Sequence, residues 1–155
     1  MKKGERWKIY WDNYLLNAYL YGSEIDFRDK DDVIIHNNLI PPGTVMKTWY
    51  SKTNFQGQRI EPSLPIIDGE GEYIIRNDIE SDIEGGIIIR VLYYDRHDVE
   101  IGQLIIKEKE KRFRCPMATY SYRLQLINAG ARNVRFHSIE IQEVLYESEE
   151  QAETI

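Results

Sequence analysis

The sequence predicts an all-β fold, an antiparallel β-sandwich or jelly roll, and two observations support this prediction. From residue 71 to residue 144, apolar and polar side chains alternate with a period of two, which gives each strand one buried and one solvated face. The alternating runs are short and recur about every ten residues between turn-forming sequences, a spacing typical of sandwiches. We expect a single β-sandwich domain over residues 1–146 and a disordered acidic tail over residues 147–155.

The first half of the chain is expected to contribute four short strands, rich in β-branched or aromatic residues and bounded by polar turns, at residues 7–11, 24–28, 33–36 and 45–50. Pro41 and Pro42 indicate a loop between the third and the fourth of these strands, because consecutive prolines cannot donate hydrogen bonds to a sheet. The stretch from Trp49 to Pro65 is polar and ends in prolines, so most of it is expected to form a surface loop.

The second half is expected to contribute five further strands, separated by polar turns, at residues 73–80, 87–95, 101–106, 120–127 and 134–144. In the last strand the apolar phase changes. Val134 and Phe136 share one phase, whereas Ile139 and Ile141 share the other. A regular strand cannot bury both pairs on one face, so we predict a β-bulge near His137.

Composition and charge argue against several classes of function. The 155-residue chain is 42% hydrophobic and carries a net charge of −6, which argues against a nucleic-acid partner because phosphate binding needs a surplus of basic side chains. Residues 107–114 form a basic cluster, but glutamates interrupt it, so we interpret it as a solvated strand edge or loop. The single cysteine excludes an intrachain disulfide, and we recognise neither a signal peptide nor an apolar run of the roughly 20 residues that a membrane helix needs. A cytoplasmic protein is therefore expected.

No residue pattern indicates catalysis, a cofactor or a metal. His36, His97 and His137 are far apart in the sequence and lack the spacing of metal ligands. Cys115 has no histidine near it in the sequence, which favours a buried, inert thiol over a nucleophile. The chain has neither a nucleophile elbow nor a phosphate-binding loop, and its acidic turns lack the spacing of a calcium loop. We expect no enzymatic activity, no cofactor and no metal site.

The aromatic residues suggest a surface that binds a partner protein. Within a strand, the neighbours in Trp49-Tyr50 and in Tyr93-Tyr94 must point to opposite faces, so one of each pair is expected near the surface. The loop that begins at Trp49 is expected to contact a partner subunit, with Trp49 or Phe55 as an anchor. The expected contact residues are Trp49, Lys52, Asn54, Phe55 and Gln56.

A second candidate surface lies on the outward rows of two predicted strands. Arg90 and Tyr94 share one strand face, and Arg123 and Gln125 share a face of a later strand. If these strands are neighbours in one sheet, the four side chains form a shallow patch that could stack on a sugar ring and bond its hydroxyl groups. Weak glycan binding is one interpretation of this patch, and a plain solvated sheet face is the other.

Several segments in fixed order, spanning about residues 9–141, resemble a known family. These segments are Ile9-Tyr10-Trp11, Tyr19-Leu20-Tyr21-Gly22-Ser23, Trp49-Tyr50-Ser51-Lys52-Thr53-Asn54-Phe55-Gln56, Pro62-Ser63-Leu64-Pro65, Tyr120-Ser121-Tyr122-Arg123-Leu124, Leu126-Ile127-Asn128-Ala129-Gly130 and Phe136-His137-Ser138-Ile139. Together they are similar to the third accessory secretory protein of the accessory Sec system of Gram-positive bacteria.

The resemblance implies a cytoplasmic, non-catalytic subunit whose fold is like that of a carbohydrate-binding module. It implies a complex with two larger accessory secretory proteins, which works with an accessory motor ATPase to export serine-rich repeat glycoprotein adhesins. Membrane contact is implied only indirectly, through the translocase. Two alternatives stay open beside it. One is a free-standing glycan-binding module, and the other is a small β-sandwich enzyme, such as a sugar isomerase, which would need His, Glu and Tyr to converge.

Overall fold

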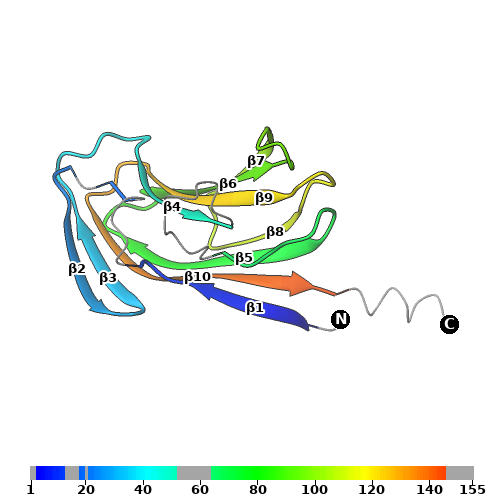
Figure 1. The fold of residues 1–155 in the computed structure, drawn as a ribbon. Coiled ribbons are helices and arrows are strands. Elements are labelled where there is room, and N and C mark those ends of the chain that lie inside the picture. The colour runs from blue at the N-terminus through cyan, green and yellow to red at the C-terminus, as the bar shows by residue number, and fades with distance from the viewer. Residues whose placement is uncertain (1–2, 13–17, 20, 52–63, 146–155) are drawn as a thin grey trace.

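The computed structural model describes residues 3–12, 18–19, 21–51 and 64–145, and these residues form an all-β molecule. Two antiparallel sheets pack face to face (Figure 1), which confirms the expected fold class. The first sheet has the order β2-β3-β10-β5-β8, with β1 also paired to β10, and the second sheet has the order β4-β9-β6-β7. The strands are β1 (Lys3–Ile9), β2 (Glu24–Asp29), β3 (Asp32–His36), β4 (Val45–Tyr50), β5 (Glu72–Ser81), β6 (Ile87–Tyr94), β7 (Glu100–Ile106), β8 (Glu110–Arg114), β9 (Ser121–Asn128) and β10 (Asn133–Val144).

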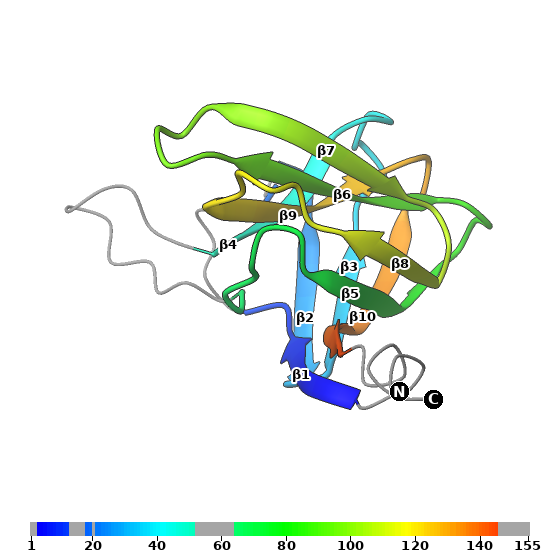
Figure 2. The ribbon, with the colours of Figure 1, turned by 90° about the vertical axis from the view of Figure 1, so that its right-hand side faces the viewer.

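The two layers are visible from the side, where β6, β7 and β9 lie above β5, β8 and β1 (Figure 2). Successive strands lie in different layers at six connections, which are β3–β4, β4–β5, β5–β6, β7–β8, β8–β9 and β9–β10. The described residues contain no helix that is long and apolar enough to cross a lipid bilayer.

β10 lies at the centre of the first sheet and contains the predicted bulge. Its first half pairs with β3, up to Phe136 opposite Val33, and its second half pairs with β1, from Ile139 onwards. β5 follows the other side of β10, and there the register shifts between Phe136 and Ser138. The shift lets Phe136 and Ile139 both point into the core, where each is 0% exposed. The bulge expected near His137 is therefore confirmed, and β1 replaces β3 beside β10 at the same point.

Three aromatic rings join the sheets beside the bulge. Trp49 of β4 stacks on Phe136 of β10 with a centroid distance of 5.5 Å, and Trp11 meets these two rings edge-on at 6.1 and 5.7 Å. The indole N–H of Trp49 donates to the carbonyl oxygen of Tyr10 at 3.0 Å. The strand expected at residues 7–11 therefore lies earlier, as β1, because the chain leaves the sheet after Ile9 and places Trp11 in the core.

The position of Trp49 corrects one expectation. Its side chain is 0% exposed, so Trp49 is not available on the surface as an anchor for a partner. Tyr50 and Tyr94 point outward and are partly exposed, whereas Tyr93 is buried like Trp49, so the expected division of each aromatic pair between two faces is confirmed. A period of two does not say which of two large aromatic residues faces inward. The rings that enclose Trp49 come from distant parts of the sequence, and they decide it.

The basic cluster at residues 107–114 contains an edge strand, β8, whose charged side chains face solvent, so the interpretation as a solvated edge holds for most of it. Phe113 is the exception, because it is buried and lies 5.8 Å from the ring of Tyr73. Arg112 and Arg114 pair with the Glu72 carboxylate of β5 at 2.6 and 2.8 Å. These contacts lower the pKa of Glu72.

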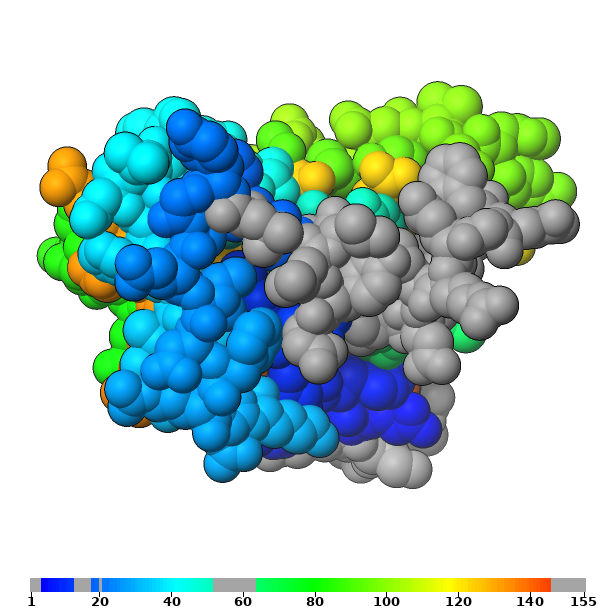
Figure 3. Space-filling view, turned by 60° about the vertical axis from the view of Figure 1, so that its left-hand side comes forward, coloured from blue at the N-terminus to red at the C-terminus, as the bar shows by residue number. Residues whose placement is uncertain are grey.

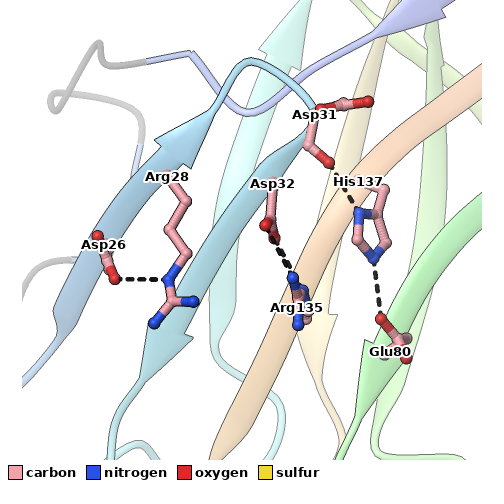
Figure 4. Close-up of polar contacts among 7 residues, drawn as sticks. All are labelled: Asp26, Arg28, Asp31, Asp32, Glu80, Arg135 and His137. Atoms are coloured by element: carbon pink, nitrogen blue, oxygen red, sulfur yellow. Dashed lines mark hydrogen bonds and ion pairs between the residues drawn. The ribbon is translucent and has the colours of Figure 1, made fainter.

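On the outer face of the first sheet, polar contacts hold the β2–β3 hairpin to β10 and β5 (Figure 4). Arg135 makes two hydrogen bonds of 2.8 Å to the Asp32 carboxylate. At the bulge, Nδ1 of His137 lies 2.7 Å from the carbonyl oxygen of Asp31, and Nε2 lies 2.8 Å from a carboxylate oxygen of Glu80. Both ring nitrogens face acceptors, so only the doubly protonated ring donates to both. The Glu80 carboxylate and the Asp31 carbonyl raise the pKa of His137.

We predict that the stabilisation from His137 falls as the pH rises. A histidine whose pKa is raised by folding stabilises the folded state fully below its unfolded pKa of about 6.5, and this effect is lost as the pH passes the folded pKa. The free energy of unfolding of the native chain should therefore exceed that of His137→Gln by more near pH ~6 than near pH ~9, as measured by urea denaturation. The pH dependence should weaken in a Glu80→Gln background. An equal difference at both pH values would contradict the protonated contact.

Trp49→Ala is expected to destabilise the fold, and not merely to remove a surface contact. Truncation of a fully buried aromatic side chain typically costs about 3–5 kcal/mol of unfolding free energy. Tyr21→Ala removes an aromatic side chain that is 73% exposed, and it should change stability by no more than about 0.5 kcal/mol. Urea denaturation followed by circular dichroism measures both. Equal stability of the two variants would mean that Trp49 is not part of the core.

Candidate functional site

The structure brings the four residues of the expected glycan surface together. β6 and β9 are antiparallel neighbours, with Arg90 opposite Gln125 and with Leu92 opposite Arg123. The inner rows of both strands fill the core, so the other rows lie on the outer face of the second sheet. Arg90, Tyr94, Arg123 and Gln125 are partly exposed there. The sequence left the adjacency of the two strands as a condition, which the structure meets, and glycan binding stays a prediction.

Arg123 lies between two tyrosine rings on this face. Its guanidinium carbon is 4.6 Å from the ring centroid of Tyr94 on β6 and 5.2 Å from that of Tyr50 on β4. Tyr50 reaches this place because β4 pairs with β9 on the side opposite β6, where Tyr50 lies opposite Arg123. A guanidinium over an exposed tyrosine ring contributes about 0.5–1 kcal/mol. The two rings therefore restrict the orientation of Arg123.

Arg90 and Gln125 form a second contact across the same pair of strands. Nε and one terminal nitrogen of Arg90 both donate to Oε1 of Gln125, at 2.9 and 2.6 Å. We call the five side chains on this face the outer patch: Tyr50, Arg90, Tyr94, Arg123 and Gln125. Sequence reasoning missed Tyr50, although the outward position of one residue in Trp49-Tyr50 was a signal that could have found it.

The outer patch offers a limited chemistry. It combines two aromatic rings with guanidinium and amide groups, a combination that suits hydroxyl-rich or polar ligands. Arg123 already covers part of both rings, so the ring surface left for stacking is small. Leu92 and Ile127, on the same face, are only 7% and 8% exposed. The patch is suited to weak contacts rather than to the enclosure of a small molecule.

The loop expected to bind a partner lies mostly outside the described residues. This applies to Lys52, Asn54, Phe55 and Gln56. Hydrogen bonds hold the two described residues that flank this loop at the end of β4. The amide N–H of Ser51 donates to the Tyr122 carbonyl at 3.2 Å, and that of Leu64 donates to the Tyr50 carbonyl at 3.3 Å. Both described flanks of the segment 52–63 therefore lie at the end of β4, beside the outer patch residue Tyr50.

Several other ionisable groups in the described part of the chain are buried or engaged in polar contacts. Cys115 is buried, and burial raises the pKa of its thiol. Lys47 is 0% exposed and its Nζ lies 2.7 Å from the Asp12 carboxylate, while burial lowers the pKa of Lys47. His36 contacts Asn133 at 2.5 Å. Among the described residues there is no group of three or more His, Cys, Asp or Glu side chains that could hold a metal ion.

Comparisons of the sequence with known proteins agree with one another. The family described as "Accessory Sec secretory system ASP3" matches residues 18–143. An accessory Sec system protein of this type from Streptococcus gordonii is 35% identical over 131 residues, which cover 84% of this chain and 82% of that protein. A second one, from Staphylococcus aureus, is 23% identical over 147 residues, covering 95% of this chain and 46% of that protein.

Solved structures give the same result. A chain in the crystal structure of accessory secretory proteins 1, 2 and 3 from Streptococcus pneumoniae matches with a TM-score of 0.83 and 30% identity, covering 91% of this chain and 98% of that one. A chain in a Glycosylation Associate Protein complex from Streptococcus agalactiae matches with a TM-score of 0.84 and 32% identity, covering 91% of this chain and 45% of that one. This chain thus spans less than half of the Streptococcus agalactiae chain and of the Staphylococcus aureus relative.

A more distant likeness concerns the fold alone. Endo-1,4-beta-D-xylanase 10B from Clostridium thermocellum, solved as its CBM22-1 and GH10 modules, matches with a TM-score of 0.50 and 12% identity, covering 90% of this chain and 29% of that one. This supports the carbohydrate-binding-module type of sandwich expected from the sequence. The family match extends over most of the sandwich, including β4, β6 and β9, which carry the outer patch. The chain therefore belongs to the ASP3 family of the accessory Sec secretory system.

Proposed function

We propose that this chain is a non-catalytic subunit of the accessory secretory protein complex and acts as an assembly or chaperone-like adaptor. In this role it binds two larger accessory secretory proteins in the cytoplasm and supports export of serine-rich repeat glycoprotein adhesins by the accessory Sec translocase and its motor ATPase. The observation that carries the proposal is the similarity to a chain in the structure of accessory secretory proteins 1, 2 and 3, which covers 98% of that chain.

The chemistry of the described residues supports a role in binding rather than in catalysis. A nucleophile is activated by an adjacent base, by a lowered pKa or by a metal. Cys115 instead lies in the core, and its raised pKa favours the neutral thiol. His137 is engaged with Glu80 and with the Asp31 carbonyl in the contact that holds the β2–β3 hairpin.

The partner surface proposed here is the segment that contains Lys52, Asn54, Phe55 and Gln56. The described residues that flank it are Ser51 and Leu64. Hydrogen bonds to Tyr122 and Tyr50 hold both flanking residues at the end of β4. A long polar segment attached to a rigid sheet end is a common position for a binding loop. With Trp49 in the core, Phe55 is the aromatic anchor that remains for a partner.

Replacement of Phe55 tests this assembly. Phe55→Ala should reduce co-purification of the tagged chain with the two larger accessory secretory proteins by about tenfold or more, because aromatic anchors commonly contribute 2 kcal/mol or more to binding. Phe27→Ala is the matched control, since it removes the same side chain from an exposed position on β2. Co-purification that is unchanged in Phe55→Ala removes this surface from the proposal. The absence of both larger proteins from the native pull-down would reject the function itself.

The outer patch supports a second candidate function, direct glycan contact. The tyrosine rings beside Arg123 and the Arg90–Gln125 pair provide stacking and hydrogen-bonding groups on one exposed face. Such a shallow patch buries little ligand area, so an affinity on the order of millimolar is expected. Many weak contacts would still hold a chain that carries many glycans. A free-standing glycan-binding module would use the same face without the larger partners.

Titration with N-acetylglucosamine, or with a glycosylated serine-rich peptide, tests the patch by NMR. Changes in amide chemical shift should map to β6 and β9 at tens of millimolar sugar. This concentration is needed to fill a site with a dissociation constant of about 1–10 mM. Arg123→Ala should abolish these shifts. Arg96→Ala, which removes an exposed arginine from the β6–β7 turn, should retain them. If the native chain shows no shifts on β6 and β9, the outer patch is not a glycan site.

A further inference from the structure

β7 is an edge strand without the charges that usually protect an exposed sheet edge. Within the part of the chain that the structure describes, β7 pairs with β6 on one side and with no other strand. Between Glu100 and Lys107 the sequence is Ile-Gly-Gln-Leu-Ile-Ile, which contains no charged residue. An uncharged edge presents its free backbone N–H and C=O groups as a template for another strand. The hairpin end that leads into β7 stands at the surface, in lime at the upper right of Figure 3.

The other described edges are covered or charged. The outer edge of β4 is covered by the chain itself, since the amides of Tyr19 and Leu64 donate to the carbonyls of Met46 and Tyr50 at 2.8 and 3.3 Å. The sequences of β1, β2 and β8 are KGERWKI, EIDFRD and EKRFR, each with three or more charged residues. Such charges oppose pairing with a foreign strand. β7 therefore differs from every other edge in the described chain.

The side chains along β7 fit a strand that receives a neighbour. Ile101 and Ile105 are 36% and 42% exposed, and Gln103 between them is exposed as well. The register against β6 shifts at Ile101, at the beginning of the strand, and the residues from Gly102 to Ile106 pair regularly. The regular part of the edge thus exposes uncharged side chains, and no other described strand pairs with it.

Gly102 is compatible with a close backbone neighbour at this edge. A glycine inside a strand weakens the strand and often marks a bulge or the close approach of another backbone. The chain's own neighbours do not require it, because a Cβ at this position would meet Tyr93 Cδ2 at 3.7 Å and Pro116 Cγ at 3.9 Å, which are ordinary contacts. Gly102 also follows the register shift at Ile101, and an irregularity of this kind accounts for a glycine there.

We propose that β7 pairs antiparallel with β7 of a second copy of this chain. The exposed row Ile101, Gln103, Ile105 is symmetric about Gln103, with an isoleucine two residues away on either side. A two-fold axis at Gln103 places Ile101 of each copy opposite Ile105 of the other, and it places Gly102 opposite Leu104, a small residue against a large one. This self-complementary row points to a second copy rather than to an unrelated strand.

The charges at the two ends of β7 favour the same orientation. Antiparallel pairing brings Glu100 of one copy to the strand end that carries Lys107 of the other, whereas parallel pairing would place like charges together. The pairing would join the second sheets of the two copies into one continuous sheet. The outer patches of both copies would then lie on the same face of that sheet. A short strand contact is small for a protein interface, so we expect a dissociation constant on the order of 10–100 µM.

Charge exchange at Gln103 tests the two-fold axis. By sedimentation velocity, the full native chain should shift from 18.4 kDa to twice that mass between about 1 and 500 µM. Gln103→Lys and Gln103→Glu should each weaken the dimer by about fivefold or more, because each places like charges opposite one another. An equimolar mixture of the two variants should restore it. Asn38→Lys, an exposed position in the turn after β3, is the control with the same change in charge.

Cysteine cross-linking tests the register. In Gln103→Cys the two thiols lie opposite one another, within the roughly 4.4–6.8 Å between Cα atoms that a disulfide needs, so oxidation should give a covalent dimer. In Ile101→Cys the two thiols are offset by four residues, about 13 Å along the strands, so no dimer should form. The native Cys115 is buried and does not compete.

Three results would overturn the proposal. The first is a native chain that stays at 18.4 kDa over the whole concentration range. The second is equal dimerisation of Gln103→Lys and the native chain. The third is a native chain that is a monomer by itself and whose Gln103→Lys variant no longer co-purifies with the larger accessory secretory proteins. That result would mean that a strand of a partner protein, and not a second copy, pairs with β7. The first two use the isolated chain, so they are independent of the export function proposed above.

Discussion

β10 must bury Phe136 and Ile139 on the same face of one strand, and much of the first sheet follows from this constraint. Residues three positions apart point to opposite faces of a regular strand, so the strand needs one extra residue between them. The bulge supplies it at the register shift between Phe136 and Ser138. The associated bend divides the side of β10 between two strands, β3 before the bulge and β1 after it.

The same bend organises contacts on both faces of the sheet. On the inner face, Phe136 reaches Trp49 across the sandwich, and Trp11 fills the remaining space beside them. On the outer face, His137 sits where the strand irregularity turns its ring between Glu80 of β5 and the Asp31 carbonyl of the hairpin (Figure 4). One inserted residue thus connects the packing of the core with the attachment of a peripheral hairpin.

The second sheet carries the candidate surfaces, and its strand order produces them. Because β4, β9 and β6 pair side by side, Arg123 lies opposite Tyr50 on one side and diagonally across from Tyr94 on the other. The ionisable residues of the described interior, such as Lys47 and Cys115, are held by packing or by an ion pair, so the accessible chemistry lies in shallow outward rows and in an uncharged edge. A molecule of this kind is suited to contact with other chains, in agreement with a family that is found in multi-protein complexes.

The sequence by itself determined the all-β class, most strand positions, the bulge in β10 and the outward rows of β6 and β9, because a period of two depends only on local backbone geometry. The tertiary structure decided which member of Trp49-Tyr50 is buried, since the rings that enclose Trp49 come from Trp11 and Phe136, distant in the chain. It also decided that β6 lies beside β9 and that β7 lies at an open edge. Strand order depends on contacts between residues far apart in sequence, and the local alternation of apolar and polar residues carries no information about these contacts.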